Sequence, residues 1–122
     1  MASEVTEIWH NPKCSKSRTA KAVLDETGAD YVERRYLDNP PTAPEIRDVL
    51  AKLGLEPWQI TRTAEPEAKD LGLSSWPKTP ADRDRWIEAL AAHPRLIQRP
   101  IVLTADGRAR IVRDDETLDT LR

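Results

Sequence analysis

A switch from strand to helix around a single cysteine is the sequence feature that most constrains this chain. Val5–Trp9 is predicted to be a short strand, and Arg18–Leu24 has apolar side chains at helical spacing. Cys14 therefore falls where a helix begins, among backbone N–H groups that have no partner within the helix and carry the positive end of its dipole. This position binds anions and favours a thiolate over a thiol.

The residues around Cys14 add positive charge to the same place. Lys13, Lys16 and Arg18 flank the cysteine, and His10 stands at the end of the predicted strand. A buried, inert thiol is the common fate of a free cysteine, but polar and basic neighbours at a helix start do not form a core environment. The sequence therefore predicts a site where a thiolate and an oxyanion are held together.

Composition limits the classes to which the protein can belong. The chain has 122 residues and one cysteine, so we predict one domain spanning 1–122 without an internal disulfide. A net charge of −2 is not the footprint of a nucleic-acid-binding protein. The sequence has no apolar run near the ~20 residues of a membrane helix and no signal region at its start. These observations predict a cytoplasmic protein with no nucleic-acid or membrane partner.

The order of predicted elements defines the fold class. Residues 30–36 are predicted to be a second strand, charged enough to lie at a sheet edge. Thr42 and Glu45 form a capping box for a helix that ends at Gly54. Another helix is predicted to begin at Thr79 and to stop at His93.

The last third of the chain is predicted to return to the sheet. Strands at 101–104 and 110–112 are joined by a turn that contains Asp106 and Gly107, and Asp114 caps a final short helix. This order predicts an α/β, thioredoxin-like fold: a central four-stranded mixed sheet with flanking helices and a helical insertion.

Four segments carry a resemblance to a known family. His10–Arg18 closely resembles the active-site loop of the glutaredoxin-coupled arsenate reductases. Tyr36–Pro41, Ile60–Arg62 and Leu96–Leu103 resemble further segments of that family, in the same order along the chain. The similarity covers nearly the whole sequence.

The resemblance implies an enzyme that reduces arsenate to arsenite with glutathione and glutaredoxin as electron donors and no tightly bound cofactor. Cys14 would be the nucleophile, and Arg62, Arg99 and Arg113 would hold the oxyanion. Arginine suits this role because its planar fork meets an oxyanion with two parallel bonds. By the same resemblance the bond before Pro100 is cis and faces the cysteine loop.

The third arginine is the least defined position. Arg113 fits one branch of the family, whereas the match to another branch falls on Val112, and Arg110 is the alternative close by. The family usually has a proline after this arginine. Here Asp114 and Asp115 follow, and their charge opposes the local positive field.

Three other residues near Cys14 are candidate site residues. His10 either lowers the cysteine pKa, as the resemblance implies, or is a strand-end histidine bonded to backbone. Ser17 is read as a helix-capping hydroxyl that could also donate to the thiolate or the oxyanion. Arg18 lies in the first helical turn, within reach of the anion. Two histidines and one cysteine, far apart, match no zinc spacing, so no metal site is predicted.

Two other functions compete with the reductase. Thiol-stress regulators that bind bacterial RNA polymerase share this fold and loop and have no arsenate turnover. Many of them carry a second cysteine where this chain has Ser17, and this difference, with Arg62 and Arg99, favours the enzyme. The third reading is a thiol enzyme that acts on another anion, because phosphate-like anions share the geometry of arsenate.

Overall fold

The computed structural model describes residues 6–28, 30–104, 106–112 and 114–121. The chain divides into two compact units, which are described separately. The first combines residues 1–39 with 99–122, and the second spans residues 40–98. Within the described ranges, no helix has both the length and the apolar character needed to cross a membrane.

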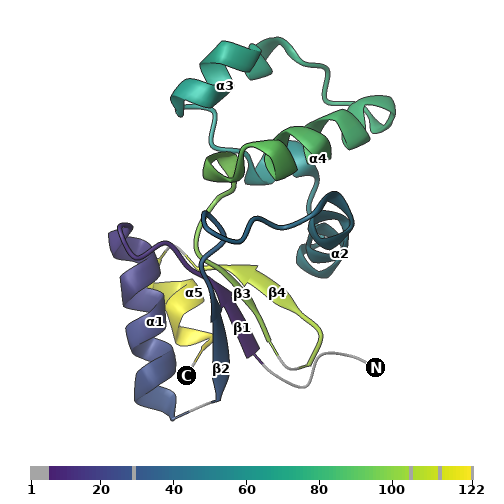
Figure 1. The fold of residues 1–122 in the computed structure, drawn as a ribbon. Helices are drawn as coiled ribbons and strands as arrows, with labels where there is room; N and C mark the ends of the chain where they lie inside the picture. Colours follow the sequence, from purple (N-terminus) through teal and green to yellow (C-terminus); the bar gives the residue numbers. More distant parts are fainter. Residues whose placement is uncertain (1–5, 29, 105, 113, 122) are drawn as a thin grey trace. The chain divides into compact units, whose positions relative to one another are not determined.

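The first unit is built on a four-stranded mixed sheet with strand order β2-β1-β3-β4 (Figure 1). Its strands are β1 (Thr6–Trp9), β2 (Tyr31–Arg34), β3 (Ile101–Leu103) and β4 (Ala109–Ile111). β1 and β2 are parallel, while β3 is antiparallel to both β1 and β4. The charged strand β2 lies at the edge of the sheet, as predicted. The four-stranded mixed sheet is the one predicted for a thioredoxin-like fold.

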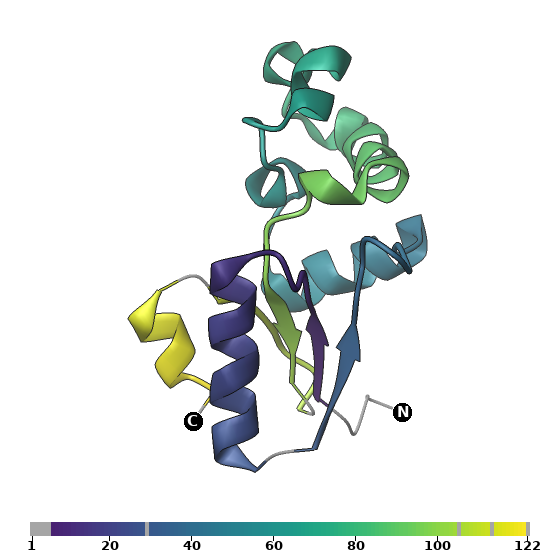
Figure 2. The ribbon, with the colours of Figure 1, turned by 60° about the vertical axis from the view of Figure 1, so that its left-hand side comes forward.

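Two helices cover one face of this sheet, α1 (Ser15–Thr27) and α5 (Asp115–Asp119), and they lie beside each other in both views (Figures 1 and 2). The apolar side chains of α1 pack with those of the strands. This core contains Ile8, Ala20, Leu24, Val102 and Val112, with Tyr31, Leu118 and Leu121 packed against it.

Local sequence signals explain where these two helices begin and end. α1 begins at Ser15, before the predicted start at Arg18, and ends at Gly28, which has the left-handed φ of 70° that glycine adopts readily. Asp114 caps α5, as predicted, by accepting a hydrogen bond from the Thr117 N–H at 2.8 Å. The predicted turn before β4 includes Ala105, which lies outside the described residues.

The strand register brings four chain segments together at one end of the strands, which is called the Cys14 edge of the sheet below. Trp9, at the end of β1, pairs with Arg34 at the end of β2 and with Ile101 at the start of β3. Ile111, at the end of β4, also pairs with Ile101. Beyond the strands, His10 N–H donates to the Arg34 carbonyl at 2.7 Å. The loop that carries Cys14 therefore starts at this edge.

The second unit is helical, which matches the predicted insertion. It contains α2 (Ala43–Leu53), α3 (Pro66–Leu71), α4 (Arg83–Ala92) and the short 3-10 turns η1 (Pro57–Ile60), η2 (Leu73–Ser75), η3 (Pro80–Asp82) and η4 (Pro94–Leu96). α2 packs against α4. Trp86, on α4, is buried, and its ring makes edge-on contacts with Trp58 and Trp76 at centroid distances of 6.2 and 5.5 Å.

Two helix starts were predicted in the second unit, and one of them is confirmed. Thr42 and Glu45 form the predicted capping box of α2, and Gly54 ends that helix. The prediction that Thr79 caps the next helix is wrong. Its hydroxyl donates to the Asp82 carboxylate at 2.7 Å, and the 3-10 turn η3 intervenes before α4 begins.

Candidate active site

Cys14 is the N-cap residue of α1. Its backbone is extended (φ −98°, ψ 123°), and its carbonyl accepts the first helical hydrogen bond, from Arg18 N–H at 3.0 Å. Its own N–H closes a turn onto the Asn11 carbonyl at 3.0 Å. The thiol is free and half-buried. The sulfur therefore stands over the first turn of the helix, as the strand-to-helix switch predicts.

The surroundings of the sulfur favour the thiolate. Partial burial acts to raise the pKa of Cys14, but the backbone N–H of Ser17, the Arg99 guanidinium and the backbone N–H of Lys16 outweigh it. The pKa of Cys14 consequently lies below that of an ordinary cysteine. Hydrogen bonds to the charged form and an adjacent cation are the two causes, and both also suit a bound oxyanion.

Arg99 is brought to Cys14 by the start of β3. The Arg99–Pro100 bond is cis, as predicted, and Pro100 accepts a hydrogen bond from Val112 N–H at 3.0 Å. The Arg99 side chain acts on Cys14 both by charge and as a hydrogen-bond donor. Arg99 is thus a predicted arginine that the structure places beside the sulfur.

His10 and Ser17 meet beneath the loop. His10 Nδ1 lies 2.6 Å from Ser17 Oγ, and both side chains are buried. The same Ser17 oxygen accepts a hydrogen bond from Asn11 N–H at 3.0 Å. The hydroxyl thus bonds to the segment before the helix, whereas the Ser17 backbone N–H faces the Cys14 sulfur. The interpretation of Ser17 as a capping hydroxyl is replaced by this role, because Cys14 occupies the N-cap position.

The pKa of His10 is lowered from the ordinary histidine value of 6.5. Burial is the main cause; Glu33 opposes it, and the cations Lys21, Arg35 and Arg18 add to it. The fold therefore favours the neutral form of His10. Its place in the site is that of a buried hydrogen-bonding ring behind the loop.

Arg18 and Asn11 brace the loop. The Arg18 guanidinium is exposed and donates to the Pro12 carbonyl at 2.9 Å, and the Asn11 side chain accepts from Lys13 N–H at 3.0 Å. These bonds hold the residues on either side of Cys14. Arg18 thus contacts the loop backbone, and oxyanion binding by its guanidinium stays a prediction.

Two of the predicted arginines are not tested by this geometry. Arg62 belongs to the second unit, where its guanidinium pairs with the Glu65 carboxylate and its N–H donates to the Leu96 carbonyl at 2.7 Å. Arg113 lies outside the described residues. Its alternative, Arg110, is on β4 opposite Val102. Oxyanion binding by Arg62 and Arg113 stays a prediction.

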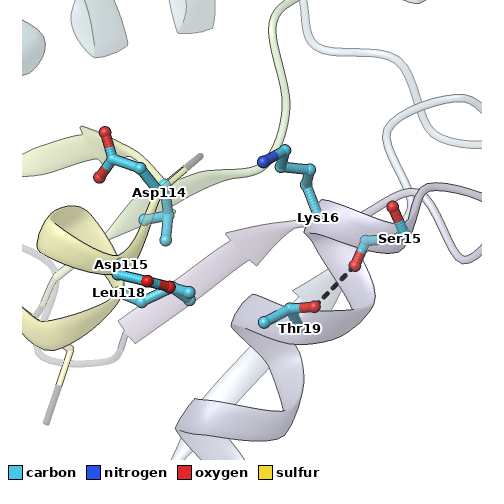
Figure 3. A pocket seen from close by; sticks show the side chains of 7 residues that line it. Ser15, Lys16, Thr19, Asp114, Asp115 and Leu118 are labelled. Carbon is cyan, nitrogen blue, oxygen red and sulfur yellow. Dashed lines mark hydrogen bonds between the residues drawn. The ribbon is translucent and has the colours of Figure 1, made fainter.

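Cavities lined by described residues lie next to the Cys14 loop. One of these cavities, about 240 Å³, lies between the first turn of α1 and the start of α5 (Figure 3). It is lined by Ser15, Lys16, Thr19, Val112, Asp114, Asp115 and Leu118. The Thr117 backbone N–H lowers the pKa of Asp114, with a smaller contribution from the Lys16 ammonium. The acidic pair predicted to oppose the positive field therefore faces the same cavity as Lys16.

Another of these cavities, about 150 Å³, lies between residues 10–13 and the turn that follows β2. That turn carries Tyr36, a buried residue that sequence analysis did not assign to the site. Its phenol lies close enough to Cys14, Arg99 and Asn11 for all three to affect its ionisation. The parallel pairing of β1 and β2 was the available signal, because it predicts that the loops after both strands meet.

The described part of the chain contains no group of three His, Cys, Asp or Glu side chains arranged to hold a metal ion. The site is thus a half-buried thiol with a depressed pKa, an arginine beside it and backbone N–H groups beneath it. This combination can bind a small oxyanion and attack it.

The fold and this site define a thioredoxin-like protein with a single active-site cysteine at a helix start. The ArsC family model matches residues 9–121, so the chain belongs to the ArsC family. An arsenate reductase from Neisseria meningitidis serogroup A is 40% identical, with 94% of this chain and 96% of that protein covered.

Two other similar proteins support the assignment. An uncharacterized protein in the glnII region of Streptomyces viridochromogenes is 57% identical, with 92% of this chain and 94% of that protein covered. The structure of an arsenate reductase from Vibrio cholerae matches with a TM-score of 0.85 and 35% identity, over 98% of this chain and 99% of that one. Both the family and the fold are therefore shown.

Proposed function

We propose that this protein reduces arsenate to arsenite with Cys14 as the nucleophile and with glutathione and glutaredoxin as electron donors. The observation that carries the proposal is the placement of the Cys14 sulfur between the α1 backbone N–H groups and Arg99 in a chain of the ArsC family. The names of the relatives, arsenate reductase, are the reason for proposing arsenate as the substrate.

The first step forms a bond between Cys14 and arsenic. The thiolate attacks dihydrogen arsenate, an S–As bond forms, and one oxygen takes up a proton and leaves as water. Arsenic stays in the +5 state in this adduct. Arg99 and the N–H groups of the first turn of α1 stabilise the negative oxygens, which are the groups that gain charge as the bond forms.

The second step transfers two electrons. A glutathione thiolate attacks the Cys14 sulfur, an S–S bond forms, and the electron pair of the S–As bond goes to arsenic. Arsenic leaves as arsenite in the +3 state after its oxygens take up two protons. Cys14 is the single cysteine of the chain, so the second thiol comes from solution. Glutaredoxin then attacks the glutathione sulfur and releases the Cys14 thiolate.

The experiment that tests the proposal is arsenate-dependent NADPH oxidation in a mixture of glutathione, glutathione reductase and glutaredoxin. We expect turnover with the unsubstituted protein and none with Cys14→Ser, which should fold normally. Mass spectrometry of the enzyme quenched during turnover should show one glutathione adduct, located on Cys14.

Three outcomes would contradict parts of this proposal. Turnover by Cys14→Ser would remove the nucleophile. Sustained turnover with thioredoxin and thioredoxin reductase, without a small thiol, would refute the donors. No arsenate-dependent oxidation by the unsubstituted protein, with binding to RNA polymerase instead, would favour a thiol-stress regulator.

A further inference from the structure

Tyr36 stands at the same sheet edge as Cys14. The parallel strands β1 and β2 end opposite each other at Trp9 and Arg34, and His10 N–H extends the pairing with its 2.7 Å bond to the Arg34 carbonyl. Tyr36 follows two residues later, in the turn after β2. The cavity of about 150 Å³ between residues 10–13 and this turn shows that the two loops lie side by side.

The phenol of Tyr36 is buried without a well-aligned hydrogen-bond partner. The residue is only 1% exposed, and among the described residues none is aligned to bond its hydroxyl oxygen. A buried hydroxyl without a well-aligned partner costs stability, so proteins rarely keep one without a reason. The neighbours that act on this phenol are Arg99, Cys14 and Asn11, which are residues of the candidate site.

The Tyr36 phenol stays neutral beside these groups. Burial raises the pKa of Tyr36 to about 12, although the Arg99 guanidinium acts in the opposite direction. A neutral phenol oxygen accepts hydrogen bonds, and a guanidinium is a donor only. Hydrogen bonds in active sites are often poorly aligned without substrate and tighten when it binds. The Tyr36 oxygen and the Arg99 guanidinium are close but not aligned, as expected for a hydrogen bond that tightens when substrate binds.

We propose that Tyr36 is a positioning residue whose hydroxyl oxygen accepts a hydrogen bond from the Arg99 guanidinium and holds it against the oxyanion at Cys14. This inference rests on the proposed function for the identity of the oxyanion. Arginine has a long side chain with many rotamers, so a fixed guanidinium loses less freedom when the anion binds.

The test is a double-mutant cycle on arsenate binding, measured by calorimetry without any thiol donor. Tyr36→Phe keeps the ring and removes the hydroxyl alone, and we expect about tenfold weaker binding from the loss of one hydrogen bond to a charged group. Arg99→Ala should also weaken binding. Tyr36→Phe on the Arg99→Ala background should have no further effect, because the hydroxyl then has no guanidinium to hold.

Tyr31→Phe is the matched control. Tyr31 is the only other tyrosine of the chain, and its hydroxyl bonds to the Asp25 carboxylate near the last turn of α1. We expect Tyr31→Phe to bind arsenate like the unsubstituted protein. Equal binding by Tyr36→Phe and Tyr31→Phe would overturn the proposal, as would additive losses in the cycle. Loss of folding in Tyr36→Phe would also contradict it, because a hydroxyl without a well-aligned partner is not needed for the fold.

If the proposed function is wrong, the role of Tyr36 can still be tested without arsenate. If the unsubstituted protein binds no arsenate, the pKa of Cys14 decides the role of Tyr36, since Arg99 acts on that pKa without substrate. Tyr36→Phe should then raise the Cys14 pKa when Arg99 is present and leave it unchanged in Arg99→Ala. An unchanged pKa on both backgrounds would overturn the positioning role.

Discussion

His10 Nδ1 and Ser17 Oγ lie 2.6 Å apart, with both side chains buried behind the loop that carries Cys14. The same oxygen accepts from Asn11 N–H at 3.0 Å. Ser17 therefore joins the end of β1 to the first turn of α1, and Cys14 lies between these two joined points. The Ser17 hydroxyl thus braces, from behind, the loop that carries the sulfur.

Ser17→Ala should destabilise the fold more than a matched change in the same helical turn. It leaves His10 Nδ1 and Asn11 N–H buried without their partner, which costs about 1–3 kcal/mol. The free energy of unfolding in urea measures this cost. Ser15→Ala is the control, because Ser15 is exposed and should change stability little. Equal effects of the two substitutions would show that the buried contact adds nothing.

Burial of His10 predicts a pH dependence of stability. The pKa of His10 is lowered in the fold from 6.5, chiefly by burial. At a pH between the folded and unfolded values, the unfolded chain binds more protons, so stability rises with pH there. The stability that His10 contributes is fully present above pH 6.5. It is lost as the pH falls through the pKa of His10 in the folded protein.

Urea unfolding as a function of pH, together with NMR titration of the two histidines, measures this effect. His10→Asn should flatten the loss of stability on the acid side. His93→Asn, which changes the chain's other histidine, should keep it. A folded His10 pKa at or above 6.5 would contradict the prediction.

Much of the sheet and of the helix caps could be predicted from the sequence, because local signals determine them. The capping box at Thr42, the glycine after α2 and the Asp114 cap are side-chain or backbone choices within a few residues. The α4 start was predicted wrongly at Thr79. The cap-plus-proline pattern does not distinguish a 3-10 turn from the first turn of an α-helix, and η3 intervenes.

The candidate site was less predictable, because its contacts join residues distant in sequence. Cys14 was found from a local pattern, the strand-to-helix switch. The bonds of Ser17 to His10 and Asn11 depend on how the loop folds back, and the burial of Tyr36 depends on strand pairing. No propensity or spacing carries this information.

Arg99→Lys should impair arsenate turnover even though it keeps the positive charge. The Arg99 guanidinium bonds to the Cys14 sulfur and can hold an oxyanion with two parallel N–H groups, whereas an ammonium is a single point charge. We expect kcat/KM for arsenate to fall about tenfold or more, as for the loss of one charge-assisted bond. Steady-state kinetics with arsenate varied at saturating glutathione measure it. Full activity of Arg99→Lys would show that charge alone suffices.

The described residues on either side of position 113 lie close to the start of β3 and to the first turn of α1. β4 ends at Ile111 opposite Ile101, and Val112 N–H bonds to the Pro100 carbonyl at 3.0 Å. Val112 and Asp114 both line the cavity next to the first turn of α1 (Figure 3). Arg110, by contrast, precedes the end of the strand and pairs with Val102, whose side chain is in the core.

Arg113→Ala should therefore lower arsenate turnover more than Arg110→Ala. We expect about a tenfold or larger fall in kcat/KM for Arg113→Ala with little change in stability, because its proposed partner is the anion. Arg110→Ala should instead lower the free energy of unfolding, because the buried Nε atom of Arg110 indicates a side chain packed on the sheet. Both quantities are measured on both variants. A greater loss of turnover for Arg110→Ala would move the third oxyanion position to Arg110.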